Sequence, residues 1–206
     1  MSNPDENKPK NKIKLTKESI IESAMALIEE HGIDRFSLRK LAQKLNCEAM
    51  SIYYHVKNKE QIFAEIVDSL ILKIEFNQSI DGAKAQLKDI AYQWRRLSQQ
   101  YPNIFLILAV HPLDSEIGQN FMHHILLILQ QTNLSAKQAS HFLRVLNYYL
   151  IGAGVDEAKG YHHAAQKQPP NSDDLLLNSA MAFWTVADQD QIFELGLDIL
   201  LSYMPD

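Results

Sequence analysis

The residues best suited to contact another molecule lie between Glu48 and Lys59. We predict a short helix over residues 48–55 in which Ile52 points inward to a core. The remaining side chains of this helix are small, polar or aromatic, and they are free to face a partner: Ala49, Met50, Ser51, Tyr53, Tyr54 and His55. Such side chains on a short helix suit base edges and phosphates in the major groove of DNA.

A second helix, directly before the first, would hold this surface in place. Its apolar residues recur at i, i+3, i+4 and i+7 and form a single stripe: Leu38, Leu41, Ala42 and Leu45. Ser37 is a typical N-cap, and Asn46 tolerates the left-handed conformation that a tight exit needs. Asn58 and Gln61 have the spacing of a capping box that opens a further helix. A helix of about nine residues, a turn and a second short helix is typical of a helix-turn-helix.

Residues 15–66 resemble the DNA-binding head of the tetracycline-repressor (TetR) family. The matching features are the helix end at His31-Gly32, the run from Ser37 to Ala42, Ile52-Tyr53 followed by His55, and the run from Lys57 to Lys59. Residues 192–200 are also similar to the last helix of the branch that contains the tetracycline repressors themselves. The resemblance is strongest over about a quarter of the chain.

The resemblance implies which residues touch DNA. It places Ala49, Met50 and Ser51 over base edges and Tyr53, His55 and Lys59 on phosphates, while Arg39 reaches a guanine or a phosphate. The predicted DNA-contact set is Arg39, Lys40, Ala49, Met50, Ser51, Tyr53, Tyr54, His55, Lys57 and Lys59. Tetracycline repressors have a larger polar residue and a proline where this chain has Ala49 and Met50, so the operator sequence does not carry over. The competing interpretation is that Tyr53 and Tyr54 pack in the core.

Charge is distributed unevenly along the chain. Residues 1–60 hold eleven Lys and Arg against nine Asp and Glu, whereas residues 61–206 hold nine against sixteen, for a net charge of −5. A mildly basic head on an acidic body suits a protein whose head alone touches phosphate. The single cysteine, Cys47, excludes an internal disulfide and fits the cytoplasm. We expect no signal peptide and no membrane span, because no apolar run approaches about 20 residues.

The whole chain reads as helical. We predict an all-α fold of nine to ten helices, with helices over residues 16–31, 37–46, 48–55, 59–76, 83–100, 103–110, 113–131, 135–159, 173–187 and 190–204, and a long loop over 160–172. The predicted organisation is a flexible basic arm (1–14), a three-helix helix-turn-helix domain (15–60) and a ligand-binding and dimerisation domain (61–206), joined by a long fourth helix.

The last helix is apolar on nearly every side, and a helix of that kind is buried all round. At the end of a chain this favours burial against a second copy. The resemblance implies that this helix and the helix over 135–159 form a four-helix bundle with their symmetry mates. The predicted homodimer interface is Tyr149, Gly152, Ala153, Phe193, Leu197, Leu200 and Leu201. A twofold dimer presents two recognition helices to double-stranded DNA, so the operator should be a near-palindrome.

The body also holds aromatic and polar residues that suit a ligand pocket. The predicted set is Trp94, Tyr101, Phe105, His111, Phe121, Phe142, Leu146 and Tyr149. A largely apolar small-molecule inducer would fit such a set. We predict no cofactor and no protein metal site, because HExxH and CxxC spacings are absent, although His111 and His141 could still meet in the body. Two alternatives remain: an architectural DNA-binding protein without a ligand, and a helical metal-dependent hydrolase.

Overall fold

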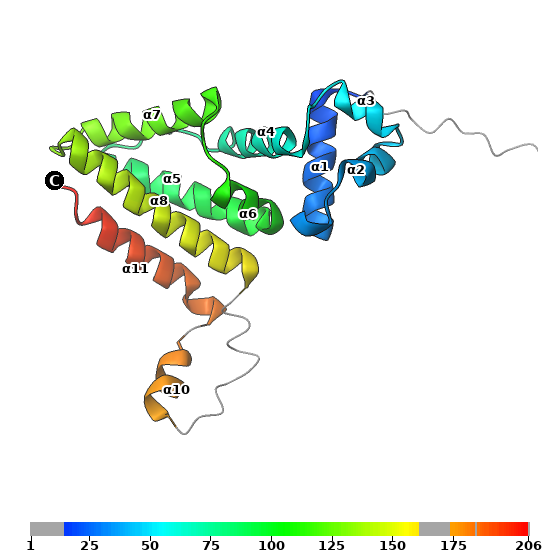
Figure 1. Ribbon diagram of the computed structural model, residues 1–206. Coiled ribbons are helices and arrows are strands. Elements are labelled where there is room, and N and C mark those ends of the chain that lie inside the picture. The colour runs from blue at the N-terminus through cyan, green and yellow to red at the C-terminus, as the bar shows by residue number, and fades with distance from the viewer. Residues whose placement is uncertain (1–14, 161–173, 184, 206) are drawn as a thin grey trace, which may run out of the picture. The chain divides into compact units, whose positions relative to one another are not determined.

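The computed structural model describes residues 15–160, 174–183 and 185–205, which hold ten α-helices, two 3-10 helices and no strand. The prediction of an all-α fold is confirmed. The helices are α1 (Lys17–His31), η1 (Ile33–Arg35), α2 (Leu38–Leu45), α3 (Ala49–Tyr53), α4 (Lys59–Ile71), α5 (Ala83–Gln100), α6 (Pro102–Val110), α7 (Glu116–Gln130), α8 (Ala136–Lys159), α10 (Leu175–Met181), η2 (Val186–Asp188) and α11 (Gln189–Leu201) (Figure 1). None of the helices in the described ranges is long and apolar enough to cross a membrane.

The chain divides into two compact units at Ile66 and Val67. We call residues up to 66 the head and residues from 67 onward the body. The predicted basic arm over 1–14 and the predicted loop over 160–172, apart from Gly160, lie outside the described residues.

Local signals fix the ends of α1. Thr16 is its N-cap, and the capping box is closed by Ser19, whose backbone N–H donates to the Thr16 hydroxyl. Gly32 ends the helix at φ 81°, a conformation in which an L side chain would be strained. The face between these caps is buried in the head: Ile20, Ile21, Ala24, Leu27 and Ile28.

The turn between α2 and α3 forms as its residue types predict. The Ser37 hydroxyl accepts the backbone N–H of Lys40, and Asn46 adopts the left-handed conformation at φ 52°. The helix α3 is shorter than the predicted 48–55, because Tyr54 and His55 leave it through a turn in which the His55 N–H donates to the Ile52 carbonyl. Ile52 is fully buried, as predicted.

The fourth helix ends at Ile71, five residues before the predicted end at 76. The cause lies on α5. The Gln93 side chain accepts the backbone N–H of Glu75 at 2.8 Å and donates to the Glu75 carbonyl at 2.8 Å. Both backbone groups of Glu75 are therefore satisfied outside a helix. At its start, Gln61 donates its N–H to the Asn58 side chain but accepts from Lys57 rather than Asn58.

The body is built around α8, which packs on α5, α6, α7 and α11 (Figure 1). Gly154 allows the closest of these approaches, because an added Cβ would lie 2.4 Å from the Phe105 ring. Phe105 is in turn fully buried and edge-on to Trp94. Ser135 caps α8, with Gln138 completing a capping box.

A buried arginine ties α5 to α8 and α11. Arg95 is 5% exposed, and it pairs with Glu157 at 2.7 Å and with Asp190 at 2.8 Å. Its guanidinium also lies 4.7 Å from the centroid of the Phe193 ring. The Tyr149 hydroxyl donates to the Phe193 carbonyl at 2.6 Å. These interactions offset the cost of burying the Arg95 charge, and they fix the position of α11 against the rest of the body.

The last helix buries one face in its own protomer, which corrects the predicted interface. Phe193, Leu197 and Leu201 are buried inside the body, so they cannot be the residues that meet a partner. The helix was expected to be covered all round by a second copy, but only its opposite face remains exposed: Ile192, Leu195 and Ile199.

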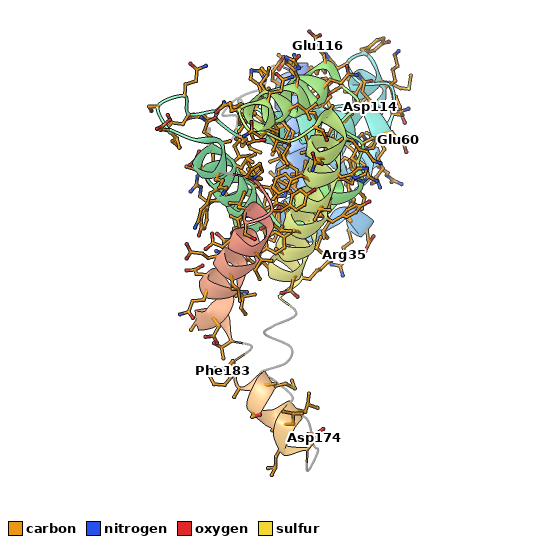
Figure 2. All side chains as sticks on the ribbon, turned by 90° about the vertical axis from the view of Figure 1, so that its left-hand side faces the viewer. Arg35, Glu60, Asp114, Glu116, Asp174 and Phe183 are labelled. Carbon is orange, nitrogen blue, oxygen red and sulfur yellow. The ribbon has the colours of Figure 1, made fainter. Side chains whose placement is uncertain are left out.

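The helix predicted over residues 173–187 is shorter in the structure. Asp174, labelled in Figure 2, caps α10 by accepting the backbone N–H groups of Leu176 and Leu177, both at 3.0 Å. The helix ends at Met181 rather than near 187, and Phe183 beyond it is exposed. Leu175 and Leu176 are also exposed, so no packed face extends this helix.

Candidate nucleic-acid interface and ligand cleft

The turn and helix from Ala49 to His55 present a surface of exposed side chains. Met50, Tyr53 and Tyr54 are 64%, 47% and 86% exposed, although each is apolar or aromatic. The alternative in which the two tyrosines pack in the core is therefore wrong. His55 is exposed and Ala49 and Ser51 are partly exposed. Because Ile52 alone anchors this segment, the other side chains are held at the surface and remain free to touch a partner.

The Arg and Lys side chains around this surface differ in the contacts that they make within the head. Arg39 and Lys57 are exposed. Lys40 is also exposed, but its ammonium donates to the carbonyl of Arg35 at 2.9 Å (Arg35 is labelled in Figure 2). The Lys59 ammonium lies 5.7 Å from the Phe36 ring centroid and 5.1 Å from that of Phe63. Lys59 thus has a structural role within the head beside its predicted role on phosphate.

The body contains a cleft with a volume of about 740 Å³ at the junction of α6, α7 and α8. Its lining is Trp94, Leu108, Ala109, Val110, His111, Pro112, Leu113, Met122, Ser140, His141, Leu143, Arg144, Asn147, Tyr148 and Ile151. His111 and His141 do line one cleft, the meeting that the sequence left open. No three metal-binding side chains gather anywhere in the described ranges.

A narrow inner cavity continues from this cleft. Its volume is about 30 Å³, and five residues line both spaces: Trp94, Leu113, Met122, Leu143 and Asn147. The cavity is apolar apart from Asn147 and the Trp94 indole, and Phe121 and Leu146 also line it. Room of this size holds about one water molecule, so a larger ligand must occupy the outer cleft.

Four of the predicted pocket residues line neither space and have other roles. Phe105 is core packing against Trp94, and Phe142 stacks on Tyr203 with the ring centroids 6.3 Å apart. Tyr149 is tied to α11, and Tyr101 lies beneath the Lys73 ammonium. Of the predicted set, Trp94 and His111 line the outer cleft, and Trp94, Phe121 and Leu146 line the inner cavity. Aromatic residue type alone did not separate core from cleft.

Sequence reasoning missed most of the polar wall of the cleft. That wall is a stripe on α8 with helical spacing: Ser140, Arg144, Asn147 and Tyr148. Arg144 is held in place because its Nε donates to the Tyr148 hydroxyl at 2.8 Å and its guanidinium lies 5.1 Å from the Tyr148 ring centroid. The i, i+4, i+7 recurrence of polar residues on a helix otherwise rich in apolar residues was the available signal.

The indole nitrogen of Trp94 has no hydrogen-bond partner. Among the buried side-chain N and O atoms of the described residues, it is the one without a hydrogen-bond partner. Trp94 as a whole is only 4% exposed. Buried donors are paired in nearly all native structures, so an unpaired one calls for an explanation.

The chain matches two family models along its length. Residues 20–66 match the bacterial regulatory proteins of the tetR family, and residues 79–204 match the tetracyclin repressor-like C-terminal domain. The tetracycline repressor protein class D of Escherichia coli is 28% identical over 196 residues, covering 91% of this chain and 88% of the relative. The biofilm operon regulator IcaR of Staphylococcus epidermidis is 29% identical over 119 residues, covering 53% and 60%.

Solved structures share the fold. Streptomyces coelicolor ActR in complex with actinorhodin has a TM-score of 0.77 at 22% identity, covering 92% of this chain and 96% of that one. TetR from Acinetobacter baumannii AYE has a TM-score of 0.74 at 22% identity, with the same coverage. The curated relatives are transcriptional regulators and not enzymes. With its head and its body each matched by the corresponding family model, the chain belongs to the TetR family of DNA-binding regulators and carries a tetracycline-repressor-like C-terminal domain.

Proposed function

We propose that the chain is a repressor that binds a near-palindromic operator as a homodimer and is released by a small, largely apolar inducer. The observation that carries the proposal is the surface of Met50, Tyr53 and Tyr54, exposed around the buried anchor Ile52. Exposed aromatic and apolar side chains on a helix-turn-helix have a use only against a partner. Base contacts from Ala49, Met50 and Ser51 would be apolar or through the serine hydroxyl, and Arg39, Tyr53, His55 and Lys57 would position the head on phosphates.

The homodimer is supported by two exposed apolar faces. On α11 these residues are Ile192, Leu195 and Ile199, which replace the buried residues first predicted. On α8, Val145 and Tyr148 are exposed, and a Cβ added at Gly152 would meet nothing within 4 Å. A second backbone can approach closely at such a position. Ala153, Leu200 and Tyr149 are only partly exposed and would lie at the margin of this interface.

The inducer site is best supported at the cleft of α6, α7 and α8. The cleft lies within the body, and a volume of about 740 Å³ is in the range of small-molecule sites. ActR has been solved in complex with actinorhodin, so a protein of this fold takes a ligand. An architectural protein without a ligand would have no use for such a cleft, so we favour the ligand-responsive function.

A hydrogen bond connects the start of α7, a helix that lines the inducer cleft, to α4, the helix that begins in the head and ends in the body. The Ser115 hydroxyl donates to the Asp68 carboxylate at 2.5 Å, and the same hydroxyl caps α7 by accepting the N–H of Gly118. Met122, about two turns along α7 from Ser115, lines the cleft. A ligand that moves α7 would therefore pull on α4, and it would weaken DNA binding by its difference in affinity for the two states.

Selection of bound sequences from a random duplex pool at moderate salt tests the proposal. We expect an enriched near-palindrome whose half-sites are separated by about one helical turn or slightly more. Retention that depends only on salt, with no enriched sequence, would contradict sequence-specific binding. A variant with Leu195→Asp, which places a charge on the exposed face of α11, should bind the selected duplex far more weakly, because a single head loses the second half-site.

A further inference from the structure

The unpaired N–H of Trp94 belongs to a side chain that lines the cleft. Trp94 lines both the outer cleft and the inner cavity. Its ring is fixed from two sides, because Phe105 packs edge-on at 6.1 Å between centroids and Phe121 stacks at 6.2 Å. These two contacts restrict the orientation of the indole. A ligand oxygen would satisfy this donor.

The formally charged side chain of the cleft lining is a cation, Arg144. The titratable or cationic residues of its lining are His111, His141 and Arg144, together with the phenol of Tyr148, and the lining contains no aspartate or glutamate. This contrasts with the rest of the body, since residues 61–206 hold sixteen acidic residues against nine basic ones. Arg144 uses only its Nε on Tyr148, which leaves the outer N–H groups of the guanidinium for an anion.

Apart from these groups and the polar Ser140 and Asn147, the lining is apolar and suits a hydrocarbon skeleton. Leu108, Leu113, Met122, Leu143 and Ile151 supply this surface. Methionine adapts to the outline of a ring, and leucine and isoleucine give area without polar atoms. A ligand bound here would remove much of its apolar surface from water while keeping one polar end near Arg144.

We infer that the inducer is an apolar, ring-containing organic anion, with an oxygen that accepts the Trp94 N–H and a negative charge beside Arg144. The inference rests on the proposed function, since it names the class of ligand for the same cleft. It excludes ligands that enter as cations, because the lining provides no carboxylate to compensate a positive charge.

Three probes of one shape test the ligand class: 2-anthroate, 2-anthramide and 2-anthrylmethylammonium. They share the ring system and differ in charge and in their ability to accept a hydrogen bond. Their binding to the full chain is followed by fluorescence anisotropy in buffer containing EDTA. We expect the anion to bind about tenfold more tightly than the amide and the cation to bind most weakly, because a charge-assisted bond is stronger than a neutral one.

Two variants separate the contacts. Arg144→Gln should weaken the anion about tenfold and leave the amide within about twofold, because only the anion uses the charge. Trp94→Phe should weaken the anion and the amide together, because both carry an acceptor. The matched control is Lys137→Gln, which removes a charge from the exposed first turn of the same helix but lies outside the lining. Arg144 and Lys137 are both exposed, so these two variants should fold.

The outcomes distinguish this inference from the proposed function. Equal binding of the three probes, a preference for the cation, or an anion preference that survives Arg144→Gln each overturns the ligand class. Absence of binding by all three also overturns it. The same protein is assayed on its selected duplex: retained operator binding leaves the repressor function standing in those cases, whereas lost operator binding in the absence of any ligand removes the function itself.

Discussion

In the head, Met50, Tyr53 and Tyr54 are exposed around a buried isoleucine, whereas in the body Trp94 is buried with an N–H that has no partner. The head therefore keeps its functional groups on the outside of a closed core. The body keeps its functional group inside, as a polar atom that the fold has not satisfied. A contact surface for DNA can be built from side chains that add nothing to stability, but a ligand site must be left incomplete within the packing.

This difference has a consequence for mutation. Substitutions on the head surface should change DNA affinity and leave the free energy of unfolding nearly unchanged. Substitutions in the body should change ligand binding and stability together, because the same residues line the cleft and fill the core. The predictions below test this separation, beginning with the largest expected effect.

The strongest test of the body compares two leucines of α11. Leu197→Asp should unfold the body, because Leu197 is completely buried and the carboxylate would lose its hydration without a partner. Leu195→Asp should remain folded, since Leu195 is 63% exposed, and it should convert the dimer to a monomer. Circular dichroism and light scattering measure the two effects. A folded, dimeric Leu197→Asp protein would contradict the assignment of this side chain to the protomer core.

In the head, Tyr53→Ala should lower operator affinity on the order of 10- to 100-fold, because neither of the two heads could then touch DNA through this phenol. The melting temperature should stay within a few degrees of wild type, since Tyr53 is about half exposed and packs little. Fluorescence anisotropy on the selected duplex measures the affinity. Glu22→Gln, an exposed position on α1, is the control and should change neither quantity by much. A large loss of stability in Tyr53→Ala would break the separation drawn for the head.

Two lysines of the head should behave differently although both are near the same surface. Lys57→Gln should reduce the slope of log affinity against log salt by about one for each phosphate that the protein no longer neutralises, with stability unchanged. Lys59→Gln should in addition destabilise the head by about 0.5–1 kcal/mol, because its ammonium lies against Phe36 and Phe63. If Lys59→Gln leaves the salt slope unaltered, its role is structural alone.

The link between the two units should depend on Asp68. Asp68→Ala removes the acceptor of the Ser115 hydroxyl and leaves the α7 cap to Gly118 in place. We expect the ratio of operator affinities without and with 2-anthroate to fall by about fivefold, within the range of measured coupling energies, while the affinity for the probe changes little. The control Asp81→Ala removes an exposed carboxylate just before α5 that lies outside the cleft lining. An unchanged ratio in Asp68→Ala would place the coupling elsewhere.

The sequence predicted the head far better than the cleft, and the reason is the range of the signals. Thr16, Ser37 and Asn46 act on a backbone within a few residues, so the ends of α1 and α2 can be read locally. The end of α4 depends on Gln93, eighteen residues beyond Glu75, and no local pattern contains it. Whether each aromatic residue packs in the core or lines the cleft likewise depends on partners that are distant in the sequence. Phe105 and Trp94 contact each other edge-on in the body, yet Phe105 is core alone and Trp94 also lines a cleft.

The smallest expected effect concerns a partly buried donor, the Tyr149 hydroxyl, which has a hydrogen-bond partner, in contrast to the Trp94 N–H. Tyr149→Phe removes a hydroxyl that donates to the Phe193 carbonyl at 2.6 Å, and it should cost about 1 kcal/mol in urea unfolding at pH 7. Burial raises the pKa of Tyr149 from its ordinary value of 10.0 to about 12, and the neutral phenol is therefore favoured by the fold. Its contribution is fully present below pH 10 and is lost as the pH rises toward 12. The stability of the wild type should fall more steeply than that of Tyr149→Phe over this interval, and parallel curves would mean that the hydroxyl titrates equally in the folded and unfolded chain.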